Sequence, residues 1–242
     1  MLALRRAVGL VRDTHHFLAA RAFYALWFAS ILACALLAYR IDRTGSWQFR
    51  WLAWNLLLAW VPYGASLLAD WLRASRPRQP WLLLIPGALW LVFLPNAPYI
   101  VTDLIHLNQR ADQWLYWYDV IMVVAFAWTG CVLGAISLGI AQGIVARHLG
   151  RLVGWLFVLV TAGLCGFGIY VGRFLRWNSW DLLTNPLTLS RDLAAVFRHP
   201  LQHPHPWALC ALFAAFVLVG YLTLTATRTA LPATIDSRPI DR

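Results

Sequence analysis

Residues 81–107 read WLLLIPGALWLVFLPNAPYIVTDLIHL, an apolar run of membrane-spanning length that two prolines interrupt. Pro95 and Pro98 lack a backbone N–H and obstruct the preceding turn, so this run predicts a broken helix. In lipid, the carbonyls freed by such a break need partners from neighbouring helices, side chains or water. The polar side chains of Asp103 and His106 follow directly. Membrane proteins often place a binding site beside a break of this kind.

The composition is typical of a protein that lies within a membrane. Hydrophobic residues make up 61% of the chain and charged residues 12%, against about 25% charged residues in a soluble domain. All 20 positive side chains are arginine, and they flank the apolar runs instead of forming a soluble basic face. The net charge of +10 therefore indicates contact with membrane lipids and not with nucleic acid.

A helix needs roughly 20 apolar residues to cross a membrane. Six runs meet this requirement, at residues 22–39, 51–72, 81–101, 116–140, 152–172 and 207–227. The sequence therefore predicts an all-α, polytopic transmembrane bundle of about six spans, in which the third span is broken. One helical domain covers 21–228. A basic amphipathic segment, 1–20, precedes it along the membrane surface, and a flexible tail, 229–242, follows it.

The distribution of arginines predicts the orientation of the bundle. Twelve arginines lie on the side of the six spans that holds both termini, and eight lie on the other side. By the positive-inside rule, we expect both termini in the cytoplasm. An even number of spans also puts the connections 102–115 and 173–206 on the same, outer side of the membrane.

Small residues recur at a spacing that lets helices approach each other closely. Three pairs in the fourth and fifth spans follow this GxxxG pattern: Gly130/Gly134, Gly139/Gly143 and Gly168/Gly172. Close packing within one bundle and a homodimer through these faces both fit the pattern. We favour the bundle because a chain with six spans has many internal contacts to make.

A second polar stretch, GRFLRWNSWDLLTNPL at residues 172–187, follows the fifth span. If the fifth helix continues through this stretch, its two arginines and two tryptophans share one face. Alternatively, Asn178 or Ser179 caps a new short helix that Asn185-Pro186 ends. Residues 188–198 then predict an amphipathic helix that lies along the interface within the 173–206 connection.

The segments FLPNAPYIVTDLIHL (93–107) and GRFLRWNSWDLLTNPL (172–187) together resemble an uncharacterised family of bacterial integral membrane proteins, a domain of unknown function. The resemblance covers most of the chain. It implies a polytopic protein of a bacterial membrane, which we take to be the cytoplasmic (inner) membrane. It implies no activity, because none is established for the family.

The two polar stretches place the candidate site residues at one membrane face. Asp103 and His106, at i and i+3, suit an acid/base pair or two metal ligands, and they are the catalytic candidates. The candidate substrate-binding residues are six further polar side chains of this face: Asn96, Asp119, Arg173, Arg176, Asn178 and Asp181. Among them, the two arginines would hold a phosphate or carboxylate. Two ligands fall short of the three or four of a zinc site, so no metal is predicted, and the sequence identifies no cofactor.

These residues also have structural interpretations. Asp103 suits a helix cap or an ion pair with Arg173 or Arg176, and the arginines and tryptophans suit anchoring at the interface. In the second span, Asn55 suits a hydrogen bond between helices, and Asp70 suits a charge near the interface.

Three functions therefore stay open. A scaffold or assembly factor would bind a partner through the polar face. A membrane-embedded enzyme would act there on a lipid or lipid-linked substrate at the outer membrane face, although no nucleophilic Ser or Cys stands beside a base. A small transporter or lipid flippase would place its binding site at the broken span, although six spans without a repeat are few for alternating access.

Overall fold

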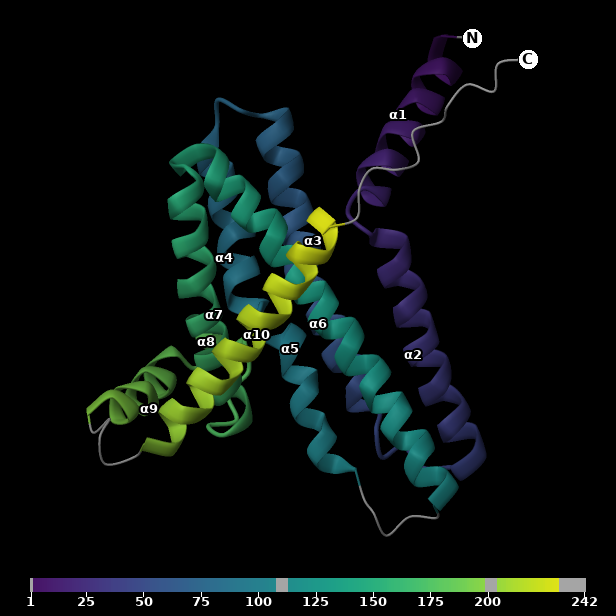
Figure 1. Cartoon of the computed structure of the whole chain (residues 1–242), viewed down its shortest axis with the longest axis vertical. Helices are drawn as coiled ribbons and strands as arrows, with labels where there is room; N and C mark the ends of the chain where they lie inside the picture. The colour runs from purple at the N-terminus through teal and green to yellow at the C-terminus, as the bar shows by residue number, and fades with distance from the viewer. Residues whose placement is uncertain (1, 108–112, 199–203, 231–242) are drawn as a thin grey trace.

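A computed structural model describes residues 2–107, 113–198 and 204–230, and the regular elements within these ranges are all helical (Figure 1). They are, in chain order, α1 (Leu2–Ala19), α2 (Phe23–Thr44), α3 (Trp51–Ser75), η1 (Pro80–Leu83), α4 (Leu84–Phe93), α5 (Asn96–Tyr99), η2 (Ile100–His106), α6 (Gln113–Leu149), α7 (Arg151–Arg173), α8 (Asp181–Thr184), α9 (Pro186–Arg198) and α10 (Pro204–Ala230). The predicted C-terminal tail, 229–242, lies outside the described residues from position 231 onward.

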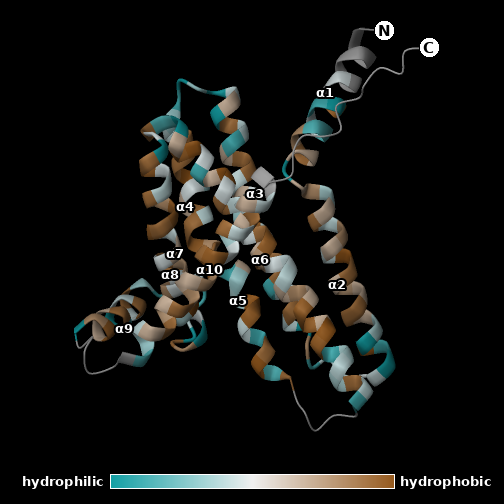
Figure 2. Ribbon diagram, viewed as in Figure 1, coloured by the Kyte–Doolittle hydropathy of each residue, from teal (hydrophilic) through white to brown (hydrophobic). Residues whose placement is uncertain are grey.

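Six helical segments are long and apolar enough to cross a membrane, which confirms the predicted number of spans. They are α2, α3, the composite segment Pro80–His106, α6, α7 and residues His205–Thr227 of α10. Apolar residues cover most of their length, and polar residues concentrate toward their ends (Figure 2). α1 extends away from the bundle beyond the start of α2 (Figure 1). The protein is therefore an all-α, multi-pass helical bundle.

The third span is broken where the prolines predict it. α4 ends at Phe93, and the chain continues through the short α5 into η2, a 3₁₀ helix. Two side chains donate to carbonyls at the end of α4: Asn96 Nδ2 donates to the Phe93 oxygen at 3.0 Å, and Ser179 Oγ donates to the Val92 oxygen at 3.2 Å. These contacts provide the partners that a helix break in lipid requires.

The broken segment packs against glycines of α6 on one side and of α7 on the other. On α6, a Cβ atom at Gly130 would overlap the carbonyl oxygen of Ala97, and one at Gly134 would lie 3.1 Å from the Ala97 methyl group. On α7, a Cβ atom at Gly168 would lie 2.5 Å from Cγ of Pro95. Two of the three GxxxG pairs therefore accommodate α5 within the chain, which is the close packing that the spacing predicts.

The connection between the fifth and sixth spans follows the second of the two predicted alternatives in part: a short helix, α8, ends at its C-cap Asn185, but Trp180 stands at its N-cap, so the predicted cap by Asn178 or Ser179 is wrong. α7 ends at Arg173, so the predicted continuation of this helix through Trp180 is wrong. Arg176 adopts a left-handed backbone conformation with φ of 61°, which no continuing helix tolerates. The chain then forms α8 and the amphipathic α9, where the Phe197 ring packs against that of Trp207 at 5.3 Å.

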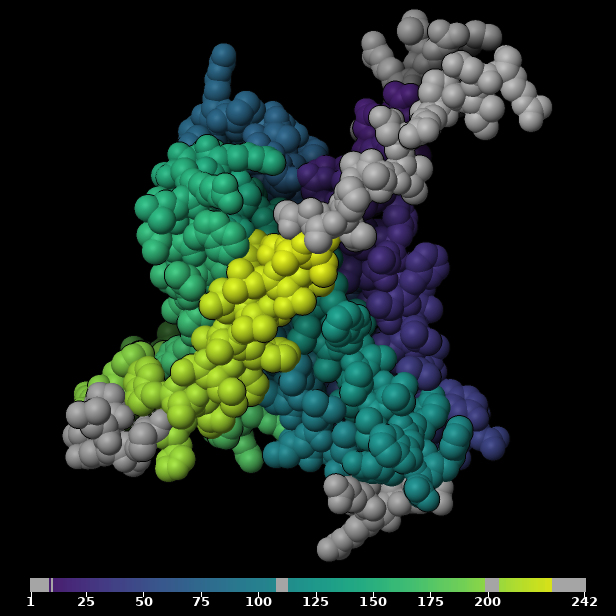
Figure 3. All heavy atoms as spheres, viewed as in Figure 1, coloured from purple at the N-terminus to yellow at the C-terminus, as the bar shows by residue number. Residues whose placement is uncertain are grey.

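α10 completes the bundle by crossing it diagonally over α7 and α6 (Figure 3). The approach to α7 is close because Gly166 has no side chain: a Cβ atom there would overlap the carbonyl oxygen of Cys210. A cluster of buried side chains that includes Trp90, Val158 and Tyr221 joins the composite third span to these helices. The broken segment is thus enclosed by α3, α6 and α7, with α10 outside.

We expect Gly168→Ala to lower the free energy of unfolding by about 1–3 kcal/mol, because the added methyl group meets the rigid Pro95 ring. Gly163→Ala, in the same helix, is the matched control, because a Cβ atom there meets nothing within 4 Å. The control should be neutral or stabilising by up to about 1 kcal/mol. Denaturant unfolding of both variants in one detergent checks this, and equal stabilities would show that the close approach is not required.

Candidate functional site

Asp103 lies at the centre of the polar contacts beyond the break. Its side chain is 2% exposed, and it joins three elements. Asn55 Nδ2 of α3 donates to Oδ2 of Asp103 at 2.8 Å, and Arg173 Nη1 of α7 lies 3.4 Å from Oδ1. The other terminal nitrogen of Arg173 donates to the Thr102 carbonyl at 3.3 Å. The side chains of Asn55 and Arg173 therefore occupy both carboxylate oxygens.

His106 projects on the same side of η2 as Asp103, as the i, i+3 spacing predicts. Its Nδ1 lies 3.8 Å from Oδ1 of Asp103, which is too long for a hydrogen bond, and 3.3 Å from the Asp103 carbonyl oxygen. The imidazole packs against the indole of Trp51 with ring centroids 5.2 Å apart, and 38% of its side chain is exposed. The two predicted catalytic residues are neighbours, but the imidazole forms no hydrogen bond with the carboxylate.

Asp119 belongs to a different ion pair from the one that Asp103 forms. Both of its oxygens accept from Arg40 of α2, at 2.7 Å from Nε and 3.0 Å from Nη2. Arg40 is 4% exposed and also lies over the Phe49 ring at 4.6 Å. This buried pair ties α2 to the start of α6. The sequence contains no signal for this pairing beyond the position of both residues at span ends on one side.

A polar cavity of about 270 Å³ lies on the face of the broken segment that α3, α7 and the 174–193 region enclose. Its polar lining consists of neutral groups, the amides of Asn55, Asn96 and Asn178, the hydroxyls of Ser179 and Tyr99, and the indoles of Trp54, Trp177 and Trp180. The remaining lining residues are apolar or glycine. Among the described residues, then, no ionisable acid or base other than the Tyr99 phenol lines this cavity.

The loop that covers the cavity is held in place by hydrogen bonds. Asn96 Nδ2 donates to Ser179 Oγ at 2.9 Å, which fastens the loop to the break. Asp181 Oδ2 accepts from the Asn178 backbone N–H at 2.7 Å and from its amide at 3.2 Å. Trp177 Nε1 donates to Asp192 at 3.0 Å, which fastens the loop to α9. The hydrogen bond from the Asn178 backbone N–H, helped by the other donors, lowers the pKa of the exposed Asp181 carboxyl.

The predicted substrate-binding residues thus fall into separate groups. Asn96 and Asn178 line the cavity, while Arg173 holds Asp103 without lining it. Asp181 shapes the loop, and Asp119 lies in the separate pair with Arg40. Arg176 is exposed and forms no hydrogen bond or ion pair with any residue that the structure describes.

Sequence reasoning missed Trp54, Tyr99 and Ser179 as cavity residues, although Tyr99 and Ser179 lie within the two polar stretches and Trp54 directly precedes Asn55. Asn55, in contrast, makes the interhelical hydrogen bond that the sequence suggested. In the part of the chain that the structure describes, no three His, Cys, Asp or Glu side chains gather closely enough to hold a metal. The cavity can offer aromatic surface and amide carbonyl oxygens to a ligand, whereas both N–H groups of Asn96 and the hydroxyl proton of Ser179 already have partners within the protein.

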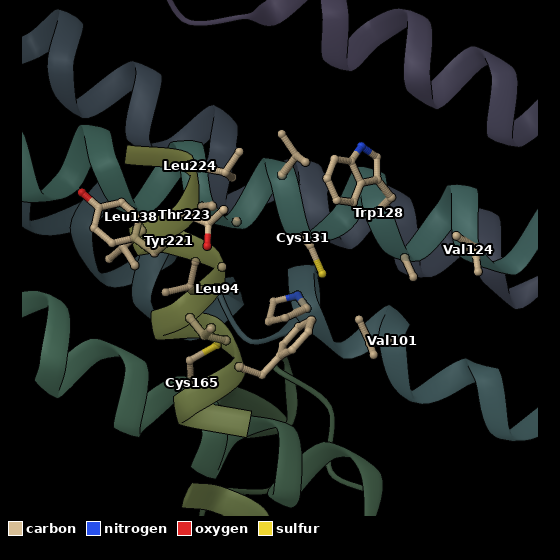
Figure 4. A pocket seen from close by; sticks show the side chains of 18 of the residues that line it. Leu94, Val101, Val124, Trp128, Cys131, Leu138, Cys165, Tyr221, Thr223 and Leu224 are labelled. Atoms are coloured by element: carbon tan, nitrogen blue, oxygen red, sulfur yellow. The ribbon is translucent and has the colours of Figure 1, made fainter. Parts of the chain in front are cut away.

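A second cavity, of about 390 Å³, lies on the opposite face of the break, between the broken span, α6 and α10 (Figure 4). Its lining is almost entirely apolar, and Leu94, Cys131, Cys165 and Leu224 are labelled in the figure. The helical turn at the break separates the two cavities. Leu94 and Pro98 face the apolar one, whereas Pro95, Asn96 and Tyr99 line the polar one.

A family model described as "Protein of unknown function (DUF1361)" matches residues 54–219, well over half of the chain. The chain belongs to this family. The match includes the whole lining of the polar cavity and the contacts among Asn55, Asp103 and Arg173. Comparison with curated proteins and with solved structures gives no match.

We expect Asp103→Asn to destabilise the protein by about 1–3 kcal/mol, because it leaves the Arg173 guanidinium without its anion. Combining it with Arg173→Gln removes the stranded charge, so the double variant should recover much of the loss. Denaturant unfolding of the two single variants and the double variant gives the coupling free energy. Additive losses would show that the two side chains do not support each other.

The Asp181 contacts predict a pH dependence of the loop. A lowered pKa means that the stabilisation is complete above the ordinary Asp value of about 3.9 and is lost as pH falls through the lowered value. Titration of ¹³C-labelled aspartate carboxyls in detergent should place Asp181 below this value. A midpoint for Asp181 at or above about 3.9 would contradict the hydrogen-bonded geometry.

Proposed function

We propose that this protein is a non-catalytic scaffold or assembly factor that binds the polar head of a lipid or lipid-linked molecule in the polar cavity. One observation carries the proposal: the cavity beside the break is lined by neutral amides, hydroxyls and indoles. Neutral donors and acceptors with aromatic surface suit recognition of a polar ligand. The position of the cavity next to membrane-spanning helices makes a lipid or lipid-linked molecule the natural ligand.

The contacts that Asp103 and His106 make favour binding over catalysis. An acid/base catalyst needs an atom directed at the reacting group. The Asp103 oxygens contact Asn55 and Arg173, and His106 packs on Trp51 outside the cavity lining. These contacts are those of residues that fasten the break to α3 and α7.

The membrane environment of the proposed function follows from the arginine distribution. We propose a multi-pass protein of the bacterial cytoplasmic membrane with both termini in the cytoplasm, which puts the polar cavity at the outer face. Three indoles in the cavity lining suit this depth, because tryptophan prefers the headgroup region.

Leu182→Trp tests the proposed binding directly. Leu182 lines the mouth of the cavity and is 50% exposed, so a larger side chain there should obstruct the cavity while leaving the bundle intact. The protein is purified in mild detergent, and the lipids that accompany it are extracted and identified by mass spectrometry. We expect one lipid class to accompany the native protein and to be depleted at least about fivefold in the variant, the equivalent of about 1 kcal/mol.

Leu183→Trp is the matched control, because Leu183 is 88% exposed and lies outside the cavity lining. It should retain the same lipids as the native protein. Equal lipid content in all three proteins would overturn the binding proposal. A covalently altered lipid that disappears from cells lacking the gene, and returns only with the native protein, would replace it with an enzymatic function.

A further inference from the structure

A third pocket, of about 270 Å³, lies at the opposite end of the bundle from the polar cavity. Ala20 and Arg21, from the turn between α1 and α2, form one side, and Asp70 near the end of α3 forms another. The rest is a stripe along α6 that ends at Arg147. The start of α2 and the ends of α3 and α6 all reach the same membrane surface, so the pocket lies at that interface.

The pocket is open because two of the α6 positions that line it, Gly139 and Gly143, have no side chain. A Cβ atom at Gly143 would meet nothing within 4 Å, and one at Gly139 would meet only the Tyr221 ring, at 3.6 Å. These two glycines form the third GxxxG pair, and they differ from the pairs that pack against the broken segment. The third pair therefore leaves a space in the bundle instead of closing one.

Positive charge is in excess around this space. Arg21 forms an ion pair with Asp70, and Arg73 Nη2 lies 2.9 Å from the other oxygen of the same carboxylate. Arg147, which lines the pocket, forms no hydrogen bond or ion pair with any described residue. Two arginines against one aspartate in the lining leave a surplus of one positive charge, and Arg73, which pairs with Asp70 from outside the lining, adds a second, so the pocket favours an anion.

The pocket is also graded in polarity along α6. Ile136, Gly139, Ile140, Gly143 and Arg147 line it in order along one helix face. At 1.5 Å per residue, the stripe runs for about 16 Å from the isoleucines within the span to the arginine at its end. A free inorganic ion would use only the charged end. A lipid would use both ends. Its headgroup phosphate would lie beside Arg147, and its glycerol and hydrocarbon would lie deeper, beside the isoleucines.

We infer that this pocket binds the phosphate of an anionic phospholipid. Guanidinium groups pair with phosphate through parallel N–H···O contacts, and Arg21 and Arg147 stand on two sides of the pocket. Basic pockets between transmembrane helices are a recurrent form of lipid headgroup site. This site uses a different part of the bundle from the polar cavity, so the two can be tested separately.

Arg147→Gln and Gly143→Leu test the inference in complementary ways. The first removes the unpaired charge without touching the Arg21–Asp70–Arg73 contacts, and the second fills the pocket at a position where a Cβ atom has space. Arg78→Gln is the matched control, because Arg78 is an exposed arginine outside the pocket in the connection after α3. The full chain, delipidated in detergent, is titrated with phosphatidylglycerol, phosphatidylcholine or inorganic phosphate and followed by native mass spectrometry.

We expect the native protein and Arg78→Gln to bind phosphatidylglycerol equally, and both pocket variants to bind it at least about fivefold more weakly. Fivefold corresponds to the loss of about 1 kcal/mol, the contribution of one arginine near an anionic lipid. Phosphatidylcholine and inorganic phosphate should bind more weakly than phosphatidylglycerol to the native protein. Unchanged binding by both pocket variants, or equal binding of the three ligands, would overturn the inference.

Discussion

The helix break at Pro95 and Pro98 is the constraint on which the rest of the bundle depends. A proline inside a helix removes a donor and obstructs the preceding turn, and a membrane provides no water to compensate. The break persists here because Ser179 and Asn96 donate to the carbonyls of Val92 and Phe93. The 174–185 loop therefore has a structural role: it stabilises the break that it also covers.

Glycines on the neighbouring helices leave space for the broken segment, and the Asp103 carboxylate fixes how this segment is oriented. The broken segment lies against the backbones of α6 and α7, where Gly130 and Gly168 have no side chains to exclude it. Asp103 then ties η2 to Asn55 and Arg173. Buried ion pairs add little net stability, since desolvation offsets the attraction, but an unpaired partner is strongly destabilising. Such a pair acts chiefly by disfavouring arrangements that separate its members, and here it restricts how α3, η2 and α7 pack together.

The sequence was sufficient to predict the spans and the break, because both depend on local properties. Run length and apolarity determine a span, and proline positions determine a break. The site was predicted only in part, because pairing depends on distances between residues far apart in the chain. Asp119 illustrates this limit: its charge and position resemble those of Asp103, yet its partner is Arg40, a residue 79 positions away. Arg176 illustrates another, because its role depended on whether α7 continued beyond Arg173.

The three GxxxG pairs show that one sequence pattern can serve opposite purposes. Gly130/Gly134 and Gly168/Gly172 allow a neighbouring segment to approach, whereas Gly139/Gly143 leaves the floor of a pocket uncovered. The difference lies in what faces each pair, and this is a property of the whole bundle. The family match covers the two sites to different extents. It covers the entire lining of the polar cavity, but it begins at Trp54 and so omits Ala20 and Arg21 of the basic pocket. The polar cavity can therefore be built from the family's own segment alone, whereas the basic pocket also requires the residues that precede it.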